Sequence, residues 1–151
     1  MNFLFIKENS IESVKTLCDM LGDLDYRITG LTAVNLYGYS IGTNCFDIAV
    51  ENDDAVYEAV NRLNLSKPFH KSYDPYTNYD DRGWWIRIQG DVLGEPVIHP
   101  AGIKLQNKPL LLEKLEIYWN YDKTIAKAIG FIAFTLNDEI TEKYKKYWQL
   151  L

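Results

Sequence analysis

The chain has 151 residues, of which 47% are hydrophobic and 14% aromatic, and its formal net charge is −5. This composition excludes general disorder and suffices for one domain with its own core. The negative net charge argues against a large nucleic-acid-binding surface, and no apolar run approaches the roughly 20 residues of a membrane span.

The two cysteines, Cys18 and Cys45, lie in unrelated segments without a CxxC spacing. We therefore expect neither a disulfide framework nor a zinc site, and the reducing cytoplasm is the expected location. A Cys45–histidine pair is not expected either, because His70 and His99 both sit beside prolines in turns.

Helices and strands are expected to alternate in the first part of the chain. Ser10 and Asn52 are good N-cap residues, because their side-chain oxygens accept hydrogen bonds from free amides of a first helical turn. Gly22 and Gly38 follow apolar helical runs and predict helix ends. The expected elements are a helix over 11–21, a strand over 26–29, a helix over 31–37, a strand over 44–51 and a helix over 53–63.

The strand expected over 44–51 has two different faces, because side chains alternate along a strand. Phe46, Ile48 and Val50 point to one side and predict a buried face. Cys45, Asp47, Ala49 and Glu51 point to the other side, which indicates a candidate chemical surface.

The middle of the chain is less regular. Residues 66–83 contain prolines, aromatics and aspartates typical of a long ordered loop or of a hairpin with a wide turn. Residues 84–89 predict a strand, with Ile86 and Ile88 on one face and Arg87 and Gln89 on the other. Short strands are expected over 96–100 and 102–105.

Helices are expected to dominate the remaining residues. Pro109 suits a first helical position, and apolar spacing predicts helices to 119 and over 125–136. Asn137 is a candidate cap for a last helix reaching 151. The predicted class is therefore α/β (α+β), a mixed sheet flanked by helices. We expect one domain over 1–151, with a core of about 10–106 and a helical tail over 108–151.

The segment from Gly30 to Glu51 resembles the signature of the minimal nucleotidyltransferase-fold family of the abortive-infection and toxin–antitoxin type. That signature is Gly-x-Ser/Thr-Ala on a short helix, a threonine element, and a strand with Asp-x-Asp. The counterparts here are Gly30-Leu31-Thr32-Ala33, then Thr43, then Cys45-Phe46-Asp47. Residues 86–89 resemble the strand that carries the last acidic residue in active members, and Lys114 resembles a lysine on a later helix.

The resemblance implies a nucleoside triphosphate and magnesium as cofactors. Gly30, Thr32, Thr43 and Lys114 would then bind the nucleotide, since backbone amides at a helix start favour phosphate. Asp47 would be the catalytic carboxylate and a metal ligand, joined by the amide oxygen of Gln89, in a site where two ions clamp the reacting oxygens.

The sequence departs from this signature at the metal ligands. Cys45 stands at the first aspartate position, and Arg87 or Gln89 stands where the last acidic residue is expected. Magnesium prefers oxygen ligands to thiols. A structural interpretation is therefore open for each site residue: Thr32 as a cap, Asp47 as a carboxylate hydrogen-bonded to the Gly30 turn, and Lys114 as a flank of an apolar stripe.

Three functions follow as hypotheses. The first is a catalytically degenerate nucleotidyltransferase-fold protein without cofactors, acting as a binding or regulatory component with a protein partner in a toxin–antitoxin or phage-defence system. The second is an active magnesium-dependent transferase that modifies RNA or protein, with a metal site rebuilt from acidic residues. That site would use Asp47, Glu51 and one of Asp74, Asp80 or Asp81. The third is a small interaction protein that shares only the architecture and uses an aromatic surface.

Overall fold

The computed structural model describes residues 11–40, 45–65, 76–79, 85–118, 123–136 and 142–148. Within these ranges helices and strands are mixed along the chain, so the predicted α+β class is confirmed. The elements are α1 (Ile11–Leu21), β1 (Arg27–Ile28), α2 (Gly30–Leu36), β2 (Cys45–Val50), α3 (Asp53–Arg62), β3 (Tyr76–Tyr79), β4 (Trp85–Gly90), β5 (Val97–Ile98), β6 (Lys104–Leu105), α4 (Lys108–Tyr118), α5 (Lys123–Phe134) and α7 (Lys145–Trp148).

The described strands form one mixed sheet in the order β3-β4-β2-β1-β6-β5. β2 runs parallel to β4, with Asp47 directly opposite Arg87. β1 pairs antiparallel with β2 and parallel with β6, where Ile28 lies opposite Leu105. The sheet centre is thus built from segments that are far apart in the sequence.

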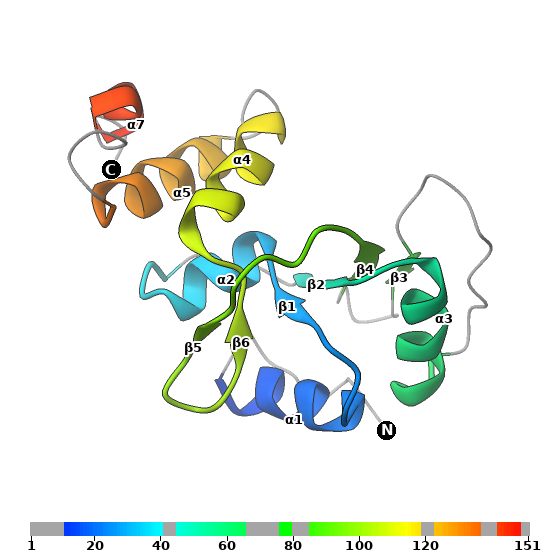
Figure 1. Cartoon of the computed structure of the whole chain (residues 1–151). Helices are drawn as coiled ribbons and strands as arrows, with labels where there is room; N and C mark the ends of the chain where they lie inside the picture. The colour runs from blue at the N-terminus through cyan, green and yellow to red at the C-terminus, as the bar shows by residue number, and fades with distance from the viewer. Residues whose placement is uncertain are drawn as a thin grey trace.

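Helices cover the sheet from different sides. Figure 1 shows α4, α5 and α7 gathered together, with α1 on the opposite side of the sheet and α3 beside β3 and β4. α2 contacts both α4 and α5, and the Tyr39 ring stacks on Phe131 with centroids 5.0 Å apart. The residues expected to form a helical tail therefore pack on the α2 side of the core.

The core confirms the predicted strand faces. Phe46, Ile48 and Val50 of β2 are buried, and so are Ile86 and Ile88 of β4. The opposite faces carry the polar side chains, including the exposed Arg87 and the partly buried Asp47 and Gln89. This alternation leaves one face of β2 and β4 available for a site.

Most helix boundaries agree with the local signals, with one correction. The Asn52 side chain accepts from the Ala55 amide at 2.9 Å, which confirms it as the cap of α3. Gly22 follows α1 with φ of +61°. α4 begins at Lys108 instead of Pro109, because the Asn107 side chain caps it by accepting from the Leu110 amide at 3.0 Å.

The structure describes parts of two further regions. β3 pairs antiparallel with β4, so the hairpin alternative for residues 66–83 is correct over Tyr76–Tyr79. The expected helix over 138–151 is interrupted by a turn at Tyr144 before α7. Several residues named above lie outside the described ranges: Ser10, Thr43, His70, Asp74, Asp80, Asp81 and Asn137.

None of the helices in the described ranges combines the length and apolar character needed to cross a membrane.

Candidate functional site

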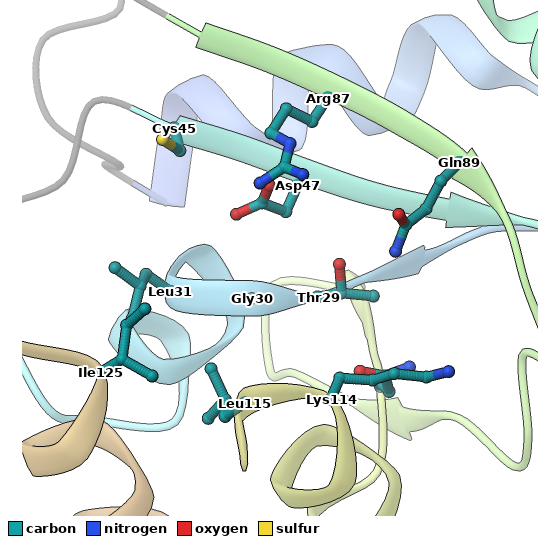
Figure 2. Close-up of a pocket in the computed structure, with 11 residues that line it drawn as sticks. Thr29, Gly30, Leu31, Cys45, Asp47, Arg87, Gln89, Lys114, Leu115 and Ile125 are labelled. Atoms are coloured by element: carbon teal, nitrogen blue, oxygen red, sulfur yellow. The ribbon is translucent and has the colours of Figure 1, made fainter. Parts of the chain in front are cut away.

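A pocket of about 410 Å³ lies between the polar face of β2 and β4 and the helices α2, α4 and α5 (Figure 2). This volume falls within the range of about 300–1,000 Å³ typical of small-molecule sites. Its lining residues are Thr29, Gly30, Leu31, Cys45, Asp47, Arg87, Gln89, Gln106, Lys114, Leu115 and Ile125. Four residues predicted for the site therefore meet here: Gly30, Asp47, Gln89 and Lys114.

Gly30 forms the turn from β1 into α2 and has φ of +58°. This left-handed conformation is unfavourable for residues with a Cβ atom. A Cβ at this position would also lie 2.9 Å from Cγ of Asp47 and closer still to its Oδ2. Glycine is therefore required both by the backbone conformation and by the carboxylate that packs against it.

Thr32 is completely buried and does not line the pocket. Its hydroxyl donates to the Cys45 carbonyl at 2.7 Å and accepts from the Asp47 amide at 3.2 Å. The N-cap of α2 is Thr29, so the interpretation of Thr32 as a cap is wrong. Thr32 instead ties α2 to β2 and fixes the backbone on both sides of Phe46.

Thr32→Val is expected to lower the free energy of unfolding by about 1–3 kcal/mol, because it removes a buried hydroxyl that two backbone groups contact. The matched control is Thr16→Val on α1, whose hydroxyl bonds only to the Glu12 carbonyl in its own helix. The control should change the unfolding free energy by less than about 0.5 kcal/mol. Urea unfolding measures both, and equal effects would contradict a special role for Thr32.

Asp47 occupies the centre of the polar face. Burial raises the pKa of Asp47 to about 6, and the charge of the Arg87 guanidinium acts in the opposite direction. Figure 2 shows the two side chains next to each other on neighbouring strands. The backbone carbonyl of Asp47 accepts from the Thr29 amide at 2.9 Å. Within the described residues the Asp47 carboxylate itself accepts no hydrogen bond, so the expected bond to the Gly30 turn is not formed there.

The donors in this pocket do not fit a pair of magnesium ions. Asp47 is the one carboxylate among the lining residues that the structure describes, and Arg87 lies beside it. Across the described ranges, no three His, Cys, Asp or Glu side chains are grouped to hold a metal ion. Glu51 lines a separate cavity with Asn52 and the first acidic residues of α3. Glu51 therefore does not join Asp47 in a rebuilt metal site.

Lys114 reaches the pocket from α4, but its ammonium group already forms an ion pair. Its Nζ lies 3.0 Å from a carboxylate oxygen of Asp91. The interpretation of Lys114 as only a flank of an apolar stripe is therefore incomplete. Any phosphate at this position would have to compete with Asp91 for the ammonium group.

Gln106 is a pocket residue that the sequence analysis missed. It is completely buried, and within the described residues neither Nε2 nor Oε1 has a hydrogen-bond partner. Its backbone is fixed, since its amide donates to the Ile28 carbonyl at 2.9 Å and its carbonyl accepts from the Tyr37 hydroxyl at 2.5 Å. A single glutamine after a two-residue strand has no periodicity or spacing that would have marked it.

The other missed lining residues are Thr29, Leu31, Leu115 and Ile125. The last three supply apolar walls from α2, α4 and α5. Their helical spacing predicted burial but gave no indication that the three helices meet around one cavity. His99 does not line the pocket, so it is not a partner for Cys45 there.

Comparison of the sequence with protein-family models found no matching family, and comparison with curated proteins found no matching relative.

Proposed function

We propose that this chain is a nucleotidyltransferase-like protein that has lost two-metal catalysis and acts as a binding or regulatory component. The observation that carries the proposal is the pairing of Asp47 with Arg87 across β2 and β4. Active members of the family resembled would carry the last acidic residue on the strand adjacent to Asp-x-Asp. Here that strand is β4, and it presents the Arg87 guanidinium and the Gln89 amide to the pocket.

The balance of charges in the pocket supports the proposed loss of two-metal catalysis. Two metal ions about 4 Å apart need several carboxylates to offset four positive charges. Among the described lining residues Asp47 is the one carboxylate, and the Arg87 guanidinium adds a further positive charge beside it. Cys45 at the first ligand position offers a soft thiol in place of a hard oxygen.

The proposal is also supported by two side chains expected to bind phosphate, which already have other partners. The Thr32 hydroxyl is used in two backbone contacts, and Lys114 is paired with Asp91. The proposed setting is the one implied by the resemblance, a toxin–antitoxin or phage-defence system in which the chain binds a protein partner in the cytoplasm. Its two cysteines, buried Cys18 and partly buried Cys45, form no disulfide within the described part of the chain, which is compatible with a reducing compartment.

One observation favours the active alternative. The pKa of Asp47, raised by burial to about 6, still lies below neutral pH, so the carboxylate is mostly in the ionised form that a metal ligand needs. An assay of nucleotidyl transfer must therefore compare the wild-type chain with an Asp47 variant, because a lack of transfer by the wild-type chain alone would not decide between the two alternatives.

The test is nucleotidyl transfer from ATP, CTP, GTP or UTP labelled at the α-phosphate, with magnesium or manganese and with cellular RNA and protein as acceptors. We expect label incorporation by the wild-type chain to equal that by Asp47→Asn, because one carboxylate cannot hold two metal ions. Transfer by the wild-type chain that is lost in Asp47→Asn would overturn the proposal and establish the active alternative.

A further inference from the structure

We infer that the pocket binds an uncharged cyclic amide, a flat ring with neighbouring N–H and C=O groups, through the Gln106 carboxamide. Nucleobases such as uracil and non-nucleobase lactams share this chemistry. The inference deepens the proposed function, on which it rests, by naming the ligand class of the same site.

The first argument is the unpaired state of Gln106. A buried polar side chain normally has a hydrogen-bond partner, because leaving one without a partner destabilises the fold. Gln106 is completely buried, lines the pocket, and has neither carboxamide atom paired within the described residues. Its backbone is held by Ile28 and Tyr37, which restricts movement of the side chain to another partner.

The second argument is the shape of the hydrogen-bonding group. A carboxamide presents an N–H donor next to a C=O acceptor. Its complement is an acceptor next to a donor, and a cyclic amide holds this pair rigidly on one edge of a ring. Glutamine reads base edges in the same bidentate way. Among the other lining residues, Leu31, Leu115 and Ile125 provide apolar surface for the faces of such a ring.

The third argument is the charge of the pocket. Arg87 lies opposite Asp47, and Lys114 pairs with Asp91, so each cation near the pocket has a carboxylate beside it. The charges of Lys114 and Asp91, which lie 3.0 Å apart, largely offset one another. The described lining holds two cations, Arg87 and Lys114, and one carboxylate, Asp47. Asp91, outside that lining, supplies a second carboxylate through its ion pair with Lys114, so these four charges balance and an uncharged ligand matches the pocket.

The experiment is a titration of the full chain with uracil, uridine and 2-pyridone, followed by the NMR signals of the Gln106 side-chain Nε2H₂ group and by calorimetry. We expect at least one of the three to bind and to shift the Gln106 signals. Its fully N-methylated analogue (1,3-dimethyluracil, 3-methyluridine or N-methyl-2-pyridone) should bind at least about tenfold more weakly, because a lost bidentate pair costs about that factor. Binding by uracil and uridine alone identifies a nucleobase, whereas binding by 2-pyridone identifies a general lactam site.

Gln106→Leu is the matched variant, and it should also weaken binding at least about tenfold. Thr16→Val, on the exposed side of α1, should bind as the wild-type chain does. The inference is overturned if no probe shifts the Gln106 signals, or if Gln106→Leu binds as tightly as wild type. The NMR measurement on wild-type protein decides the question even where the variant does not fold.

The two proposals can fail separately. The titrations with uracil, uridine and 2-pyridone contain no metal ion and no triphosphate, so Asp47-dependent label transfer would overturn the proposed function without affecting them. Uridine triphosphate that binds at least about tenfold more tightly than uridine, with Gln106 unshifted, would instead identify a phosphate site and overturn the inference.

Discussion

Gly30→Ala is expected to lower the free energy of unfolding by about 2–5 kcal/mol, combining left-handed backbone strain with overpacking. The strain arises because φ is +58°, and the overpacking arises because the new Cβ would lie 2.9 Å from Cγ of Asp47. The Asp47 backbone is itself held by Thr29 and Thr32, so the strand cannot simply move away. Chemical denaturation followed by circular dichroism measures the loss.

Two variants separate these contributions. Gly102→Ala has the same conformational problem, with φ of +86°, but its Cβ would meet nothing within 4 Å. It should cost only about 1–2 kcal/mol. Combining Gly30→Ala with Asp47→Ala removes the carboxylate, so the double variant should lose about 1 kcal/mol less than the sum of the single losses. Strict additivity would contradict a clash between the two residues.

Asp47→Asn is expected to stabilise the fold at neutral pH and to leave it almost unchanged near pH 4. The ordinary pKa of 3.8 is raised by burial to about 6, so between these values the folded state binds a proton more tightly than the unfolded state does. Wild-type stability should therefore fall as pH rises from about 4 to 6 and stay low above that window. Asparagine cannot ionise, so at pH 8 the variant should be more stable by about 1–3 kcal/mol.

The control variant, Asp23→Asn, should change the stability of the fold at neutral pH in the opposite direction. Hydrogen bonding to the Arg62 side chain lowers the pKa of Asp23, so Asp23 stabilises the fold above its unfolded pKa and loses that contribution as pH falls. Asp23→Asn should accordingly destabilise the fold slightly at neutral pH. Urea unfolding at several pH values measures both variants. If Asp47→Asn were the less stable chain at pH 8, attraction to Arg87 would outweigh the cost of burying the carboxylate.

The local parts of this structure were predictable from sequence. Periodicity identified the faces of β2 and β4, and Asn52 marked the start of α3, because each signal depends on residues within one or two turns. Asn107 was missed as a cap because Pro109 gave a competing signal two residues later. The interruption at Tyr144 has no glycine or proline to mark it.

The non-local parts were not predictable by the same means. The ion pair of Lys114 with Asp91 joins residues 23 positions apart, and no local pattern encodes such a contact. The resemblance grouped Gly30, Asp47, Gln89 and Lys114, and these four residues line one pocket. Gln106 could not be found in that way, since it stands out through complete burial without a hydrogen-bond partner among the described residues, which is a property of packing.

The parallel pairing of β1 with β6 has a consequence for the order of events during synthesis. The partner of β1 on one side, β2, ends at Val50, whereas its partner on the other side is not available until residues 104 and 105 have been made. Long-range pairing of this kind forms late, because the chain between the partners must first be ordered. Gln106, Leu115 and Ile125 follow that strand, so the pocket walls are completed after the sheet. We therefore expect a nascent chain to acquire ligand affinity only after Ile125 has emerged from the ribosome, when most of the sheet is already in place.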